Sequence, residues 1–234
     1  EREKQIINAM KNQRVDGLVV SLSKHTKDYE HFMALEKYNI PIVFFDRVPS
    51  LPNVNKVSFN MESGTREAIE FLISKGHRRI GILNGPEEMK SSRERTETFK
   101  QMLVKMRLKI DLSLVVNTDL TRESTEKAMQ QLLDVKPRPT AVLAINDYVA
   151  LDAIQYVRRL GLATDKDIAF VSYANLPITT YLQHPPMASV EQYPYQQGAK
   201  AASILMDAIH HNNTGEALPA QNIVIDGKLV VHQK

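Results

Sequence analysis

The sequence predicts an α/β protein with parallel sheets, and two patterns carry that prediction. Short apolar runs rich in β-branched residues recur along most of the chain, and their continuous pattern is typical of strands covered on both faces. Stretches with apolar residues at helical spacing lie between these runs. A strand, a helix and a further strand in succession imply right-handed crossovers and parallel strands.

Each element can be read in order along the chain. The predicted buried strands are 17–22 (GLVVSL), 41–45 (PIVFF), 79–83 (RIGIL), 140–145 (TAVLAI) and 168–172 (IAFVS). One helix places Ile69, Leu72 and Ile73 at i, i+3 and i+4, and Gly76 suits its left-handed C-terminus. A later helix carries an apolar face made of Ala201, Ile204, Leu205, Ala208 and Ile209. The best loop candidates are 47–56, which contains two prolines, and 210–219, which contains Asn-Thr-Gly.

The composition sets the bounds on what the protein can be. A chain of 234 residues can bury the core of one large domain or of two smaller lobes. No apolar run approaches the roughly 20 residues of a membrane span, and the first four residues lack the apolar stretch of a secretory signal. Without cysteine, neither a disulfide framework nor a thiolate metal site can form, which suits a cytoplasmic location. The net charge of +3 does not by itself indicate nucleic-acid binding.

The sequence contains none of the common catalytic motifs. The sequence contains no G-x-G-x-x-G, no Walker phosphate loop, no G-x-S-x-G elbow and no H-E-x-x-H. The pair His210-His211 lies at a polar helix end without a carboxylate or a third histidine, so a solvated surface pair is favoured over a metal site. We therefore expect no enzyme activity, no cofactor and no metal.

Several segments in order resemble the effector domain of the lactose-repressor family. The most specific are 64–86 (GTREAIEFLISKGHRRIGILNGP), 91–99 (SSRERTETF) and 139–162 (PTAVLAINDYVALDAIQYVRRLGL). The others are VDGLVVS from residue 15, IPIVFFDR from 40, DIAFVSYANLP from 167, ASVEQYPYQQGAKAA from 188 and VIDGKLVVHQK from 224. The similarity extends over essentially the whole chain.

The resemblance implies an organisation that composition does not reveal. In the family, a helix-turn-helix, a hinge and a strand-helix-strand precede the helix with which this sequence begins, so we expect these parts ahead of residue 1 in the natural protein. The family also has two periplasmic-binding-protein-like lobes joined by three crossings, here expected near Phe59-Asn60, Glu191-Gln192 and Pro219-Ala220. The expected lobes are 1–58 with 192–219, and 59–191 with 220–234.

Polar residues follow four of the predicted strands. In open α/β sheets, ligands bind beyond the carboxyl ends of the strands, where helix N-termini point their free amides. Carboxylates, amides and arginine forks at these ends suit the hydroxyls of a sugar. The resemblance adds Gln192, which falls where the family crosses between lobes beside the ligand. The predicted ligand-binding residues are Asp46, Arg47, Ser91, Arg95, Asn146, Asp147, Tyr173, Asn175 and Gln192.

Several of these residues have a plainer alternative, and Asp46 can simply be a residue at the start of a loop. Asp147 can simply cap the helix that begins there, which leaves Asn146 better placed to meet a ligand. Arg95 can be one of several solvated arginines on a helix, but it matches the arginine of the family's R-x-x-G-F pattern. A cleft-facing arginine makes few core contacts, so Arg95→Ala is expected to weaken effector binding at least tenfold and to change thermal stability little.

One departure from the family concerns the ligand. The family's GFDD segment reads Ser172-Tyr173-Ala174-Asn175 here, so the carboxylate that usually grips sugar hydroxyls is absent from position 174. A modified sugar, an acidic sugar or another small metabolite remains open, and Arg47, Arg93 and Arg95 would suit an anion.

The resemblance implies the effector-sensing and dimerisation core of a DNA-binding transcription regulator. Its expected partners are a small sugar-like or anionic effector, operator DNA read by the preceding helix-turn-helix, and a second copy of the chain. The helix after Met61 and the segment near Leu218 are the expected dimer contacts. The alternative is a periplasmic sugar-binding protein of the same architecture, which serves a transporter, and an enzyme of the doubly wound class comes third.

Overall fold

The computed structural model describes residues 1–234 except 24, 165, 215–217 and 233–234. The chain forms two compact units: unit 1 is Glu1–Phe59 with Tyr193–Ile225, and unit 2 is Asn60–Gln192 with Asp226–Lys234. The third passage between the units follows Ile225, later than the expected Pro219-Ala220. The reason is that strand β9 (Asn222–Asp226) pairs with β3 (Asn55–Asn60), which keeps that segment in the sheet of unit 1.

The sheet of unit 1 has four strands in the order β1-β2-β3-β9. Strands β1 (Leu18–Val20), β2 (Ile42–Phe45) and β3 run parallel. Its helical elements are α1 (Arg2–Asn12), α2 (Glu30–Met33), the 3-10 helix η1 (Ala34–Tyr38) and α7 (Pro194–Thr214).

Alternating residues of β2 face the two sides of this sheet. Phe44 packs edge-on against Phe32 of α2, with ring centroids 5.4 Å apart, in a core shared with Ile7 of α1. Val43 joins the other core, which contains Ala201 and Ile204 of α7. Because neighbouring residues of a strand point to opposite faces, an apolar run such as PIVFF fits a strand with helices on both sides.

The sheet of unit 2 has six strands in the order β10-β8-β7-β6-β4-β5. Strands β4 (Ile80–Asn84), β5 (Val115–Asn117), β6 (Ala141–Ala144), β7 (Ala169–Tyr173) and β8 (Ala188–Glu191) are parallel. Strand β10 (Lys228–Val231) pairs antiparallel with β8 at the edge. The α/β fold class with parallel sheets is thus confirmed.

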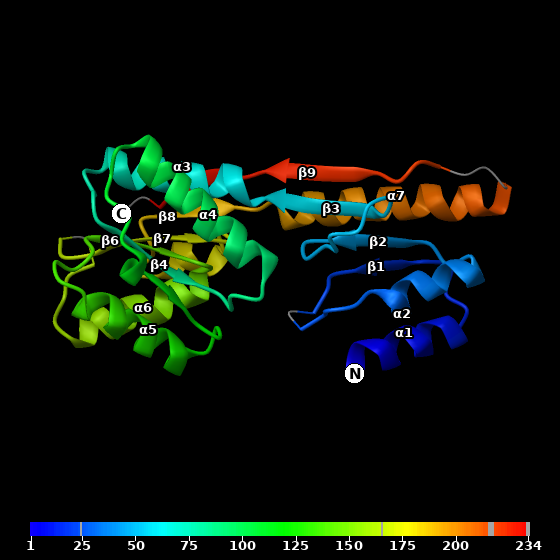
Figure 1. Cartoon of the computed structure of the whole chain (residues 1–234), viewed down its shortest axis with the longest axis horizontal. Helices are drawn as coiled ribbons and strands as arrows, with labels where there is room; N and C mark the ends of the chain where they lie inside the picture. The colour runs from blue at the N-terminus through cyan, green and yellow to red at the C-terminus, as the bar shows by residue number, and fades with distance from the viewer. Residues whose placement is uncertain (24, 165, 215–217, 233–234) are drawn as a thin grey trace. The chain divides into compact units, whose positions relative to one another are not determined.

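Helices cover both faces of this sheet. Figure 1 shows α3 (Met61–Ser74) and α4 (Lys90–Lys105) on one face, and α5 (Arg122–Asp134) and α6 (Asp147–Arg159) on the other. The core under α5 and α6 contains Leu132, Val142, Ile154 and Phe170, each almost fully buried. Side chains of this kind each contribute about 1.5–3 kcal/mol when removed from water. Short 3-10 helices lie at Leu112–Leu114 (η2) and Pro177–Tyr181 (η3).

The element boundaries agree with the sequence except in the loops. All five predicted strands are present, and Gly76 has the positive φ of 93° expected after a helix. The predicted loop 47–56 is shorter because β3 begins at Asn55, and the predicted loop 210–219 begins later because α7 continues to Thr214; residues 215–217 of that loop lie outside the described part. None of the described helices combines the length and apolarity that a membrane crossing requires.

Candidate functional site

The parallel strands of unit 2 bring several polar residues to one edge of the sheet. Strands β4, β7 and β8 end at Asn84, Tyr173 and Glu191, and Asn146 closes the turn after β6. Carboxyl ends of parallel strands share one edge, which is where ligands bind in open α/β sheets. This carboxyl edge is the candidate site.

Arg95 is a deeply buried cation at this edge. It lies on α4 and is only 2% exposed. Its Nη1 donates a hydrogen bond of 2.7 Å to Asn84 Oδ1, and its guanidinium carbon lies 4.5 Å from the centroid of the Tyr173 ring. Its Nε is buried without a hydrogen-bond partner. A guanidinium over an aromatic face gains from the ring quadrupole, so Tyr173 provides a platform for the charge.

Burial lowers the pKa of Arg95, and the neighbouring Tyr173 only partly opposes that shift. Among the described residues no ion pair of Arg95 with a carboxylate is found, but the negative charge of Glu94 on the same helix also opposes the lowering of its pKa. An arginine remains protonated in proteins, so the structure holds a buried cation here. The expectation that Arg95 makes few core contacts was wrong, because its side chain is enclosed by Asn84 and Tyr173.

Tyr173 is held in place from the side of α3. Its hydroxyl lies 2.7 Å from Thr65 Oγ1, and Thr65 donates a 2.7 Å hydrogen bond to the Met61 carbonyl. Burial raises the pKa of Tyr173 above its ordinary value, so the phenol stays neutral. The ring under Arg95 is therefore fixed by a neutral hydrogen-bonded chain.

Asn146 is the N-cap of α6. Its side-chain oxygen accepts a 2.9 Å hydrogen bond from the Val149 amide, which satisfies one of the free donors at the helix start. The side chain is half-buried, and its amide nitrogen is the group left to face a ligand. The capping role that the sequence allowed for Asp147 thus belongs to its neighbour.

Asp147 is fully buried and is used inside the protein. Its Oδ1 accepts hydrogen bonds from the hydroxyls of Ser172 and Ser189, the latter at 2.6 Å, and its Oδ2 accepts from the Leu176 amide at 2.6 Å. His232 Nε2 lies 3.0 Å from Ser189 Oγ. The expectation that Asp147 contacts a ligand is therefore corrected: its carboxylate ties α6 to β7, to β8 and to the loop after β7.

The loop after β7 is shaped by two left-handed residues, Ala174 with φ 98° and Asn175 with φ 51°. The Asn175 amide donates a 2.9 Å hydrogen bond to Glu191 Oε2, and the Ala174 amide donates to the Val190 carbonyl. A carboxylate thus lies beside position 174 after all, but it comes from the neighbouring strand. Gln192, the next residue, is half-buried and ends the first long stretch of unit 2.

The remaining predicted residues fall in different places. Ser91 is half-buried in the first turn of α4. Asp46 and Arg47 belong to unit 1, where both are exposed directly after β2. Asp46 has a left-handed φ of 57° and accepts a 3.2 Å hydrogen bond from the Ser21 hydroxyl. The structure therefore gathers the unit 2 residues at one edge and places Asp46 and Arg47 at the carboxyl end of a strand in the other unit.

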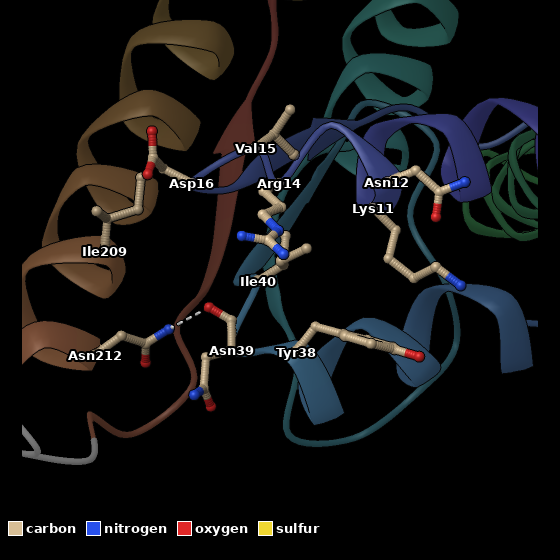
Figure 2. Close-up of a pocket in the computed structure, with 10 residues that line it drawn as sticks. All are labelled: Lys11, Asn12, Arg14, Val15, Asp16, Tyr38, Asn39, Ile40, Ile209 and Asn212. Atoms are coloured by element: carbon tan, nitrogen blue, oxygen red, sulfur yellow. Dashed lines mark hydrogen bonds between the residues drawn. The ribbon is translucent and has the colours of Figure 1, made fainter.

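Unit 1 also contains a hollow of about 820 Å³ (Figure 2). It lies between the ends of α1 and η1 and the C-terminal part of α7, where the Asn212 amide donates a 3.1 Å hydrogen bond to the Asn39 carbonyl. Its lining includes Asp16 and Ile40, which precede β1 and β2. This hollow is therefore at the amino ends of the strands, away from the edge at which such sheets bind ligands.

Sequence reasoning missed the residues that support the site. Asn84 bonds Arg95 with its oxygen and donates through its nitrogen to the Ser92 carbonyl at 2.8 Å. Ser172 and Ser189 are polar residues inside otherwise apolar strands, and His232 follows the last strand. A polar residue that interrupts a buried apolar run was the available signal, since such a group needs a partner inside the protein.

The comparisons with known proteins define the class. Residues 1–227 match the model of the family described as periplasmic binding proteins and sugar binding domain of the LacI family, and the chain belongs to this family. The transcriptional regulator CelR of Thermobifida fusca is 33% identical over 223 residues, covering 94% of this chain and 64% of CelR. The transcriptional repressor PurR of Photobacterium profundum is 29% identical over 212 residues, covering 91% of this chain and 63% of PurR.

A solved structure of a related regulator has the same fold. The structure of a CelR–cellobiose complex superposes with a TM-score of 0.85 and 30% identity, covering 97% of this chain and 68% of that one. The chain spans less than two thirds of the length of the CelR and PurR sequences that it matches. The resemblance to the lactose-repressor family read from the sequence is thus confirmed.

Proposed function

We propose that this chain is the effector-sensing module of a transcription regulator and that its effector is a small sugar-like molecule. The observation that carries the proposal is the buried Arg95, held by Asn84 over the ring of Tyr173 at the carboxyl edge of the sheet. A buried guanidinium with an unpartnered Nε is a donor set prepared for a bound acceptor. The relatives PurR and CelR are named transcriptional regulators, and the CelR structure contains cellobiose.

The regulatory step would be a coupling between two sites. The effector would bind at the carboxyl edge, and a DNA-reading module of the complete regulator would bind an operator. If the effector changes operator affinity by some factor, operator DNA must change effector affinity by the same factor. A cytoplasmic location and the absence of enzyme activity follow from this role as parts of the proposal.

The first experiment is calorimetric titration of the protein with a panel of mono- and disaccharides and sugar acids. For a ligand that binds, Arg95→Ala should weaken binding at least tenfold, about 1.4 kcal/mol, because truncation removes the central donors. Arg93→Ala is the matched control, since Arg93 is an exposed arginine on the same helix whose Nη1 donates to the carbonyls of Glu87 and Glu88. Unchanged affinity in folded Arg95→Ala would contradict the proposed site.

We propose that the complete regulator is a homodimer, because a two-fold symmetric operator is read by two-fold related modules. The helix after Met61, which is α3, and the segment near Leu218 remain the proposed contact regions. Light scattering at micromolar concentration should give twice the monomer mass. A strictly monomeric complete regulator would contradict this part of the proposal.

A further inference from the structure

The end of the unit 2 sheet opposite the carboxyl edge contains a hollow of about 300 Å³. Ile80, the first residue of β4, lies in its lining, whereas Asn84, the last residue of that strand, bonds Arg95. The hollow is therefore separate from the candidate effector site. Of its nine lining residues, four are basic and one is acidic: Arg78, Arg79, Arg107 and Lys109, with Asp111.

The floor of this hollow is apolar, and the end of α4 builds most of it. The Leu108 amide donates a 2.8 Å hydrogen bond to the Leu103 carbonyl, and the Arg107 amide donates one of 2.9 Å to the Val104 carbonyl. These two bonds form a Schellman motif, which brings the residue after the helix against its last turn. Leu103 and Leu108 consequently line the hollow together with the buried Leu114. The hollow thus offers an apolar surface inside a basic rim.

Arg107 occupies a backbone position that glycine fills elsewhere in unit 2. Its φ is 54°, in the left-handed region. Helices α3 and α6 end in the same pair of hydrogen bonds and have Gly76 and Gly161 at the corresponding position, with φ of 93° and 80°. A left-handed backbone strains a residue that has a Cβ. The arginine therefore adds nothing to the turn that glycine would not add, and its distinguishing contribution is its charged side chain.

The acidic residue of the lining is already paired. Asp111 Oδ1 accepts from the Ser113 hydroxyl at 2.6 Å, and Asp111 Oδ2 accepts from Arg79 Nη2 at 2.6 Å. The bonds from Ser113 and Arg79 lower the pKa of Asp111 to about 2. The carboxylate is therefore ionised, and it neutralises Arg79 rather than the other cations of the rim.

The other three basic side chains keep an unpaired charge. Arg78 Nη1 donates to the carbonyls of Ile73 and His77 at the end of α3, where a cation offsets the negative end of the helix dipole. Within the described part of the chain, the exposed side chains of Arg107 and Lys109 make no hydrogen bond and no ion pair. The rim thus presents three cations without a carboxylate partner.

We propose that this hollow binds a small organic phosphate, whose phosphate groups pair with Arg107 and Lys109 and whose organic part lies on the leucine floor. A planar guanidinium can donate two parallel hydrogen bonds to a phosphate, and a lysine adds a point charge. Three unpaired cations favour a ligand with two or more negative charges, such as a nucleoside diphosphate. The volume of the hollow is at the lower end of the range of about 300–1,000 Å³ for small-molecule sites.

The test compares ligands that differ in charge or in their organic part. Titration calorimetry would measure the affinity of the protein for ADP against adenosine, for glucose 6-phosphate against glucose, and for pyrophosphate. At least one organic phosphate should bind at least tenfold more tightly than its neutral partner. ADP should also bind several-fold more tightly than pyrophosphate, because only ADP covers the apolar floor. Binding should weaken as the ionic strength rises, since the cations are exposed.

Three variants locate the phosphate. Arg107→Gly removes the cation and introduces the residue that suits a left-handed backbone, so binding should weaken at least tenfold while the melting temperature stays the same or rises. Lys109→Ala should weaken binding several-fold. Arg14→Gly is the matched control, because Arg14 also has a φ of 54° and follows the end of α1 in unit 1. This control should leave phosphate binding unchanged.

Three results would overturn the inference, and the proposed effector site would stand in each case. The first is that neither organic phosphate binds more tightly than its neutral partner. The second is a phosphate preference that survives in both Arg107→Gly and Lys109→Ala, which would place the phosphate elsewhere on the protein. The third is equal affinity for ADP and pyrophosphate, which would leave the organic part of the ligand without a role.

Discussion

Replacing Asp147 with Asn changes the hydrogen bonds that support the candidate site and keeps the shape of the side chain. In the protein, both oxygens of Asp147 accept hydrogen bonds: from Ser172, from Ser189 and from the Leu176 amide. An asparagine has only one oxygen, so its NH2 group must face at least one of these donors. With the oxygen turned to the serine hydroxyls, the Leu176 amide is left without an acceptor. With the oxygen turned to Leu176, the hydroxyls of Ser172 and Ser189 lose their charged acceptor and must rotate to accept from the NH2 group.

The expected cost follows from these contacts. Hydrogen bonds to a charged group each contribute about 1.5–3 kcal/mol, and a buried donor left unpaired costs about 1–3 kcal/mol. Because Asn keeps one acceptor, we expect the free energy of unfolding to fall by about 2–5 kcal/mol rather than by the sum of all the bonds. For a chain of this size, that loss lowers the melting temperature by roughly 5–15 °C.

Urea unfolding followed by circular dichroism would measure the change. Asp152→Asn is the matched control on the same helix, because burial raises the pKa of Asp152 and its charged form is already disfavoured; it should cost nothing measurable. A stability loss below about 0.5 kcal/mol in Asp147→Asn, within the range of ordinary surface substitutions, would refute the reasoning.

Three further predictions concern neighbouring groups. Asn146→Asp keeps the cap oxygen and removes the amide donor, so effector binding should weaken while the free energy of unfolding stays the same. Asn146→Ala should weaken binding and also lower the free energy of unfolding by about 1 kcal/mol, because the helix cap is lost. Equal unfolding midpoints for the two variants would contradict the capping role of Asn146. Burial lowers the pKa of His232 below its ordinary 6.5, and Asp147 only partly opposes this shift, so the unfolded chain binds the proton first and the melting temperature should fall as the pH drops through 6.5. His232→Gln should lack this fall between pH 7.5 and 5.5. Parallel pH profiles of the variant and the parent would contradict a contribution from His232. Tyr173→Phe removes the hydrogen bond to Thr65 but keeps the ring under Arg95, so the free energy of unfolding should fall by about 1 kcal/mol in thermal unfolding. A loss of effector-binding free energy larger than this would show that the hydroxyl contacts the ligand.

The strands and their order along the chain were readable because the fold buries them on both faces. Runs such as PIVFF and TAVLAI are short and rich in apolar and β-branched residues, which is typical of a strand in a sheet that is covered on both faces. The pairing of β9 with β3 was not readable, since β9 alternates half-buried and exposed residues and carries no continuous apolar run. The third passage between the units was consequently placed too early.

The place of the candidate residues in the sheet was predicted from the sequence, but their contacts were not, and ligand binding by them stays a prediction. Polar residues after strand ends indicated the carboxyl edge correctly for Arg95, Asn146 and Tyr173 of unit 2. Which of two adjacent residues caps a helix and which is buried depends on partners far along the chain, as the bond between Asp147 and Ser189 shows. Spacing alone does not contain that information.

If an effector held by Arg95 controls DNA binding, the effector must change the DNA affinity of the parent protein but not that of Arg95→Ala. Fluorescence anisotropy would follow binding of the complete regulator to labelled DNA from the region upstream of its own gene, with and without a saturating effector from the titrations. In the parent, the effector should shift the DNA dissociation constant by about 5- to 150-fold, the usual range of allosteric coupling. In Arg95→Ala, DNA affinity without effector should be unchanged and the shift should disappear at the same effector concentration. A shift of the same size in the variant would contradict the account.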